Sequence, residues 1–109
     1  MGKRIDVTAS HILWDNPFQA ATFASHWDVH GGEWSVDGET LSGKCRTPNA
    51  FVFSRQRFPG NVLMDFHGRT VPPSTHDLDF MWNTDWDEKT QSRSSGYVVG
   101  IHGWWHGKL

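Results

Sequence analysis

The chain has 109 residues, of which 37% are hydrophobic, 20% charged and 14% aromatic, and its formal net charge is −2. A single packed domain is therefore expected, and a disordered chain is excluded. The charge is too low for nucleic-acid binding, and no apolar run is long enough to cross a membrane. No signal-peptide core follows the first residues, so a native N-terminus would imply a cytoplasmic protein.

The first part of the chain predicts one short helix and a hairpin. Asn16-Pro17-Phe18-Gln19 is typical of a helix start, because asparagine caps, proline fits the first turn and glutamine can reach back to the cap. The helix should continue through AATFASHW, with Phe23 and Trp27 on one face. EWSV and ETLSGKC then flank Asp37-Gly38, a pair typical of a two-residue hairpin turn.

The second part of the chain predicts further strands. The segments at 50–58, 61–70 and 76–84 carry strand-like patterns, and an extended run resumes at 97–107. The polar stretch DWDEKTQSRSSG at 85–96 is expected to form a long loop. Short strands at this spacing predict a mainly β fold, an antiparallel jelly roll or β-sandwich, with one short N-terminal helix.

The chain stops at Leu109, directly after a glycine-punctuated strand. A sandwich cut there would expose strand edges and one apolar sheet face. The sequence therefore predicts a single, incomplete domain over residues 1–109, or a chain completed by a partner. A homodimer would serve equally well.

Aromatic and polar residues are concentrated near the end of the chain. Four of the seven tryptophans and three of the seven histidines lie between His76 and His106. Flat rings mixed with hydrogen-bonding groups suit a pyranose, although large aromatics also build cores. Trp86 is the strongest stacking candidate, because a lone tryptophan in a polar loop has little structural role. The candidate sugar-binding residues are Trp82, Asn83, Trp86, Tyr97, Trp104 and Trp105.

The candidates for acid–base catalysis are Asp77, Asp79 and His102. The two aspartates share a strand face about 6.5–7 Å apart. Side-chain freedom makes the carboxyl separations of both retaining and inverting glycosidases reachable. One negative charge would raise the pKa of the other carboxyl, as a general acid requires. A polar outer face or a calcium-coordinating edge is the alternative for the pair, and a structural histidine is the alternative for His102.

No cofactor is expected, with calcium left open as the alternative. Asn83, Asp85 and Asp87 offer oxygen ligands of the kind that calcium prefers, but the run lacks the glycine and the distal glutamate of a calcium loop. His102 and His106 would lie about 13 Å apart along a strand, too far to chelate one zinc ion. No nucleotide-binding fingerprint occurs in the sequence.

The order of these segments resembles the concanavalin A-like lectin/glucanase superfamily. HWDVHGGEWSVDGETLSG resembles its opening strand pair, and FVFSRQRFPGNVLMDFHGR resembles the pair that follows. HDLDFMWNT and GYVVGIHGWWHGK resemble an uncharacterised bacterial subgroup near glycoside hydrolase-like jelly rolls. The resemblance spans residues 12–109 and covers the N-terminal half of that fold. It implies two curved sheets whose concave face binds carbohydrate, in a bacterial polysaccharide pathway.

The sequence departs from the hydrolytic members of that superfamily. Their E-x-D-x-x-E motif would align with Asp77 and Asp79, but Trp82 stands in place of the last glutamate. This argues against hydrolysis by that route and leaves open whether the chain is an enzyme. The sequence therefore predicts a carbohydrate-binding or glycoside-processing domain with an oligo- or polysaccharide as partner. The alternatives are a non-catalytic protein-interaction domain and an inactive fragment of a larger jelly roll.

Overall fold

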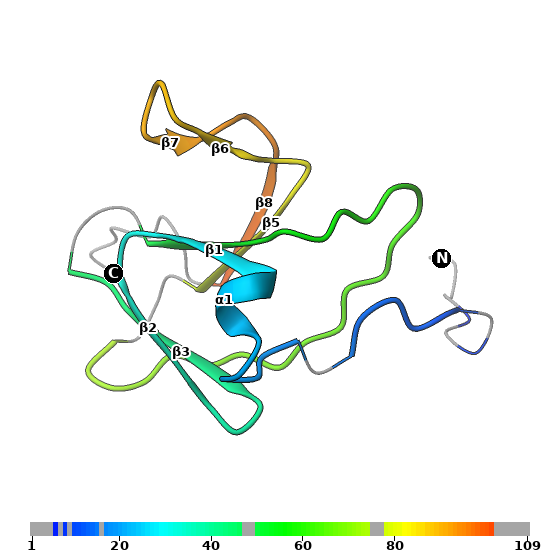
Figure 1. Ribbon diagram of the computed structural model, residues 1–109, viewed down its shortest axis with the longest axis horizontal. Helices are drawn as coiled ribbons and strands as arrows, with labels where there is room; N and C mark the ends of the chain where they lie inside the picture. The colour runs from blue at the N-terminus through cyan, green and yellow to red at the C-terminus, as the bar shows by residue number, and fades with distance from the viewer. Residues whose placement is uncertain are drawn as a thin grey trace, which may run out of the picture. The chain divides into compact units, whose positions relative to one another are not determined.

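The structure is a computed structural model, and its chain forms small antiparallel sheets and one short helix (Figure 1). The prediction of a mainly β chain with one short helix is confirmed. The chain divides into two compact units, Met1–Gln56 and Arg57–Leu109, which are described one at a time. The residues that the structure describes are 6, 8, 10–15, 17–46, 50–74 and 78–101.

Unit 1 contains the helix and its first sheet. Helix α1 (Phe23–His26) leads directly into strand β1 (Trp27–His30), which pairs antiparallel with β4 (Phe51–Ser54). The predicted start of the helix at Pro17 is wrong, because residues 17–19 are irregular and the helix is a single turn. Local capping signals stabilise a helix only weakly, and the residues from Trp27 on pair with β4 as a strand instead.

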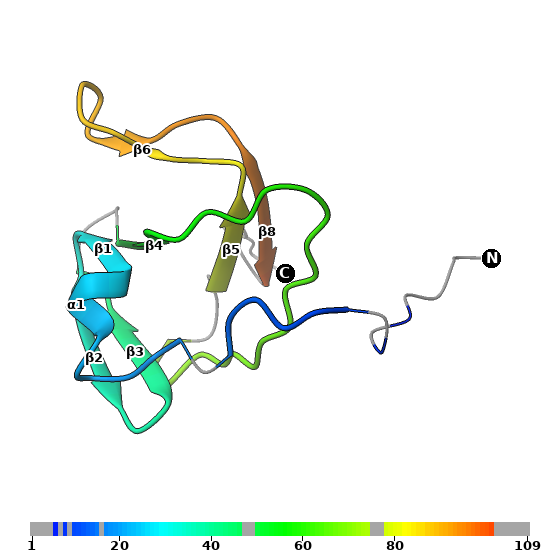
Figure 2. The ribbon, with the colours of Figure 1, turned by 45° about the vertical axis from the view of Figure 1, so that its right-hand side comes forward.

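The second sheet of unit 1 is a hairpin of β2 (Glu33–Asp37) and β3 (Thr40–Lys44), visible in Figure 2. The hairpin was predicted and is confirmed, but its two turn residues are Gly38 and Glu39, one position later than expected. Gly38 has a φ of 60° at the first turn position, as a type II′ turn requires. Opposite Trp34, a Cβ on Gly43 would overlap the indole ring, so the ring lies across the glycine.

Unit 2 contains one long hairpin that is interrupted once. Strand β5 (Leu78–Trp82) pairs with β8 (Tyr97–Ile101), and β6 (Trp86–Asp87) pairs with β7 (Ser92–Arg93). The two pairs have the same register. Trp86 lies four residues after Trp82, and its partner Arg93 lies four residues before Tyr97, the partner of Trp82. In Figure 1 the chain bends sharply between the β5–β8 pair, hereafter the inner pair, and the β6–β7 pair at the tip, hereafter the outer pair. The predicted loop over 85–96 is therefore wrong, and only residues 88–91 form the turn.

The interruption between the two strand pairs is held by specific contacts. Asn83 has a left-handed backbone with a φ of 54°. A Cβ on Gly96 would lie 2.7 Å from the carbonyl oxygen of Asn83, so only glycine fits there without a shift. The Thr84 hydroxyl donates to the carbonyl of Ser94 at 2.8 Å, and the Ser94 backbone N–H donates to the carbonyl of Asp85 at 2.7 Å.

The segment before β5 is irregular. The predicted strand over 61–70 is wrong, because none of these residues is in a strand. The segment instead contacts the hairpin through side chains: Phe66 stacks on Phe80 with ring centroids 3.4 Å apart, and a Cβ on Gly68 would lie 2.7 Å from Leu78. An alternating pattern decides which way side chains point, but a strand also needs a neighbour to pair with.

The described part of the chain holds no fully buried side chain. This agrees with sheets of two strands each, which have too little area to enclose a core. Among the described residues, no helix has the length and apolar character needed to span a bilayer. Large apolar side chains exposed on the surface are Ile12, Leu13, Val29, Val62, Leu63, Met64, Phe66, Val71, Trp82, Tyr97 and Val99.

Candidate functional site

The predicted site residues are divided between described and undescribed parts of the chain. Asp77, His102, Trp104 and Trp105 lie outside the described residues. The other candidates, Asp79, Trp82, Asn83, Trp86 and Tyr97, all belong to the long hairpin of unit 2. The candidate site is therefore built from this hairpin.

Trp82 and Tyr97 form an exposed aromatic pair, hereafter the aromatic platform. They are opposite each other at the last rung of the β5–β8 ladder, where cross-strand side chains lie on the same face. Their ring centroids are 5.5 Å apart and the ring planes differ by 20°. Trp82 is 40% exposed and Tyr97 is 59% exposed. Both rings are thus accessible to a ligand although each packs on the other.

The spacing of the two rings limits how a ligand could bind. A separation of 5.5 Å lies inside the range of direct aromatic contact, so no third ring fits between them. A flat ligand would have to stack on an outward face of the platform. Val99, on the same face of the ladder, is 51% exposed and extends the apolar surface next to Tyr97.

Asn83 follows the platform directly and is the nearest predicted polar residue in sequence. Its side chain is exposed, and its left-handed backbone is unusual for a residue other than glycine but tolerated by asparagine. A carboxamide offers both hydrogen-bond donors and acceptors. Asn83 therefore supplies an exposed, uncharged amide directly after strand β5 ends at Trp82.

Trp86 occupies a different environment from the one expected. It lies in strand β6 opposite Arg93 and is half-buried, rather than standing alone in a loop. The reason for ranking it first among the stacking candidates was therefore wrong. Its part in ligand binding stays a prediction.

Asp79 points away from the platform. It lies in β5 between Leu78 and Phe80, and successive strand residues face opposite sides of a ladder. Trp82 shares the face of Leu78 and Phe80. Acid–base catalysis by Asp79 on a sugar bound to the platform is not supported by this geometry, and the role predicted for Asp77 lies outside the described residues.

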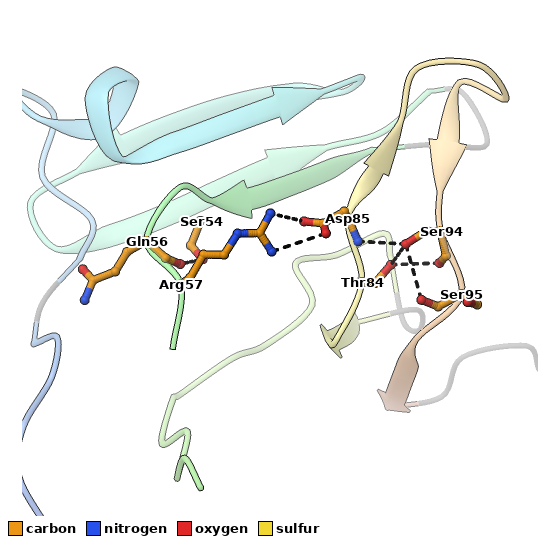
Figure 3. Close-up of polar contacts among 7 residues, drawn as sticks. All are labelled: Ser54, Gln56, Arg57, Thr84, Asp85, Ser94 and Ser95. Carbon is orange, nitrogen blue, oxygen red and sulfur yellow. Dashed lines mark hydrogen bonds and ion pairs between the residues drawn. The ribbon is translucent and has the colours of Figure 1, made fainter. Parts of the chain in front are cut away.

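Arg57, Thr84, Asp85 and Ser94 form a polar cluster (Figure 3). The guanidinium of Arg57 donates to both carboxylate oxygens of Asp85, at 2.9 and 3.3 Å. The hydroxyl of Ser94 accepts from the backbone N–H of Asp85 at 3.0 Å. The side chains of Arg57 and Asp85 are 78% and 61% exposed. Sequence reasoning missed Arg57, because no local pattern links residues 28 positions apart.

The oxygen-rich stretch considered for calcium is engaged by protein groups. Asp85 pairs with Arg57, and one carboxylate oxygen of Asp87 accepts from the backbone N–H of Lys89 at 2.8 Å. Among the described residues there is no group of three or more histidine, cysteine or acidic side chains placed to hold a metal ion. The geometry of the described part therefore offers no support for a calcium site.

The largest aromatic cluster of unit 1 surrounds Trp27. Trp14, Phe18 and Phe23 lie with ring centroids 5.0, 5.1 and 6.4 Å from that of Trp27. The indole N–H of Trp27 donates to the carbonyl of Pro17 at 3.2 Å. The sequence did not predict this cluster. It indicated only that Phe23 and Trp27 would share one face of a helix.

One carboxyl group of unit 1 has a shifted pKa. The hydroxyl and the backbone N–H of Thr8 both donate to the carboxylate of Asp6, and these hydrogen bonds hold the pKa of Asp6 below its ordinary value. Bonds to the charged form always act in this direction. The residue is fully exposed and lies in unit 1, outside the candidate site.

Comparison with protein-family models, with curated proteins and with solved structures finds no significant match to this chain. The resemblance to concanavalin A-like proteins therefore stays a prediction.

Proposed function

We propose that the chain is a carbohydrate-binding domain that holds a pyranose ring on the aromatic platform. The observation that carries this proposal is the pairing of two accessible rings, Trp82 and Tyr97, at the end of an apolar ladder face. The apolar C–H face of a pyranose would stack on an outward ring face, and the Asn83 amide would exchange hydrogen bonds with the ring hydroxyls.

The proposal covers binding rather than bond cleavage. Asp79 faces away from the platform, so no described carboxylate pair flanks a sugar held there. An oligo- or polysaccharide is the proposed partner. We also propose that the small antiparallel sheets belong to a jelly roll of the concanavalin A-like kind.

The site can be tested by NMR with ¹⁵N-labelled tryptophan. A panel of neutral and acidic oligosaccharides is titrated into the full chain while each indole N–H signal is followed. We expect the Trp82 signal to shift on binding and the Trp27 signal to stay fixed, because the Trp27 indole is bonded to Pro17 inside an aromatic cluster. The absence of any shift across the panel, or equal shifts at both residues, would refute the proposal.

A second candidate function is a protein-interaction surface. The observation that favours it is the irregular segment of unit 2, which exposes Val62, Leu63, Met64, Phe66 and Val71. A run of large exposed apolar side chains is typical of an interface. Sedimentation at increasing concentration tests this candidate. A dimer that Leu63→Ser dissociates and Trp82→Ala leaves intact would favour it over sugar binding.

A further inference from the structure

We infer that residues 62–71, hereafter the open segment, pair with the same residues of a second copy of this chain to form an antiparallel two-stranded ladder. In this ladder His67 of one copy lies opposite His67 of the other, at a two-fold axis. The inference gives the second candidate function a specific partner and a register, and it does not depend on sugar binding.

The backbone of the open segment resembles a strand that has no neighbour within one copy. No turn or bend interrupts residues 62–71, which Figure 2 draws as a plain green coil. In the described part of the chain, the backbone N–H and C=O groups of residues 62–70 form no hydrogen bond. Such a run of free donors and acceptors is a template for pairing with another chain. Pro72-Pro73 ends the run, because proline cannot donate to a ladder.

The side chains of the open segment are exposed and largely apolar. Every residue from 62 to 69 is exposed, and so is residue 71. The large apolar side chains, with exposed fractions between 41% and 65%, are Val62, Leu63, Met64, Phe66 and Val71. Phe66 stacks on Phe80 of the hairpin and still remains 43% exposed. A continuous exposed apolar surface of this kind is typical of an interface.

Charge complementarity indicates that the partner is a second copy. Asp65 and Arg69 have opposite charges and lie four residues apart, about 13 Å along an extended strand. Neither belongs to an ion pair in the part of the chain that the structure describes. In an antiparallel ladder centred on His67, Asp65 of each copy lies directly opposite Arg69 of the other. Both charges thereby gain a partner, and opposite charges at such positions stabilise a ladder.

The same register also matches the uncharged side chains. Leu63 of one copy lies opposite Val71 of the other, so two exposed apolar residues cover each other on both sides of the axis. Phe66 lies opposite Gly68, which has no side chain to collide with the ring. Apolar contact and charge pairing therefore favour the same alignment.

Other alignments lose the charge pairs. Antiparallel registers shifted by up to one residue from the centre would place Asp65 opposite His67, Gly68, Thr70 or Val71. None of these pairs the carboxylate of Asp65 with a guanidinium. A parallel, in-register pair would place each charge opposite its own kind, which is destabilising.

The register is tested by disulfide cross-linking of the full chain, in which Cys45→Ser removes the single cysteine. In His67→Cys the two thiols would lie opposite each other, on Cα atoms about 4.5–5.5 Å apart, within the range of a disulfide. Leu63→Cys is the matched control, because its two thiols would lie eight residues apart along the ladder, about 26 Å. We expect mild oxidation to cross-link His67→Cys at least tenfold faster than Leu63→Cys.

The charge pairs are tested by sedimentation at increasing concentration. Asp65→Arg and Arg69→Asp each place like charges opposite each other at two positions of the ladder, and each should weaken the dimer at least fivefold. An equimolar mixture of the two variants restores opposite charges in the mixed dimer, whose dissociation constant should return to about the wild-type value. Both residues are exposed, and circular dichroism checks that the variants are folded.

The outcomes distinguish this pairing from the two candidate functions. A wild-type chain that stays monomeric up to millimolar concentration would overturn the inference and leave sugar binding standing. Equal cross-linking of the two cysteine variants, or a mixture of charge variants as weakly associated as its components, would overturn it too. A dimer that Leu63→Ser dissociates and both charge reversals leave intact would keep the interaction surface but reject the ladder. Loss of sugar binding, followed through the Trp82 indole signal, would leave the pairing untouched.

Discussion

The two units use the same kind of residue in opposite ways. In unit 1, Trp27 is surrounded by three aromatic rings, and its indole N–H is bonded to a backbone carbonyl. In unit 2, Trp82 stacks on Tyr97, and both rings remain accessible. A tryptophan whose indole N–H is bonded and whose ring packs against several others stabilises its surroundings, whereas one that leaves ring surface uncovered offers it to a ligand. We therefore expect Trp27 to be structural and Trp82 to be available to a ligand, a distinction that the density of tryptophans in the sequence does not make.

Trp27→Ala should have the largest effect on stability. Removing the central ring leaves Trp14, Phe18 and Phe23 without a shared partner, and we expect a loss of about 2–4 kcal/mol, somewhat below that for a fully buried tryptophan. Urea unfolding followed by circular dichroism measures the change. Trp14→Ala, which removes a ring from the edge of the cluster, should cost less. Equal losses in the two variants would show that Trp27 is not the centre of the cluster.

Gly96→Ala should destabilise unit 2. The new Cβ would lie 2.6 Å from the Cβ of Thr84 and 2.7 Å from the carbonyl oxygen of Asn83, so the backbone must shift. Overpacking of this kind costs about 1–3 kcal/mol. Amide hydrogen exchange should show faster opening of residues 82–86. Ser95→Ala is the adjacent control and should leave exchange unchanged, while normal protection in Gly96→Ala would contradict the described break in the hairpin.

Trp82→Ala should reverse the pattern seen for Trp27→Ala. We expect at least a tenfold loss of glycan affinity, equivalent to about 1.4 kcal/mol, with a smaller loss of stability than Trp27→Ala. Trp82→Phe keeps a flat ring and should retain part of the affinity. Calorimetry and urea unfolding of the same samples measure both quantities. If Trp82→Ala lost stability but still bound the glycan, Trp82 would be a structural residue rather than a binding one.

Asp28→Asn should have the smallest effect. Its pair with Arg55 is about half exposed, and such pairs contribute about 0–1 kcal/mol and are screened by salt. Urea unfolding at low and high salt should therefore give a small difference that disappears at high salt. A large loss that persists at high salt would mean that the pair supports the β1–β4 sheet more than its exposure indicates.

The sequence predicted the strands that have a clear hydrophobic alternation and also pair with a neighbouring strand. The alternation of Leu78, Phe80 and Trp82 indicated β5, and its partner β8 starts at Tyr97 as expected. The hairpin near Gly38 was also predicted, because turn chemistry is local. The same local information placed Trp82, Asn83 and Tyr97 among the candidate site residues.

The features that could not be predicted are contacts between residues far apart in sequence and strands that lack a hydrophobic alternation. The strands around Trp86 and Ser92 are short and polar, so no hydrophobic alternation distinguishes them from a loop. The segment with Val62 and Met64 alternates like a strand, yet pairs with nothing in the described chain. Arg57 pairs with Asp85, a contact that no sequence spacing reveals.

The shared register of the inner and outer strand pairs has a consequence for how this hairpin could change in evolution. The β6–β7 pair keeps the register of the β5–β8 pair. Adding or removing the same number of residues on both strands of the tip would therefore change its length and keep Trp82 opposite Tyr97. An unmatched single-residue insertion would instead reverse the facing of every side chain beyond it. Length variation at this tip should therefore occur in balanced pairs.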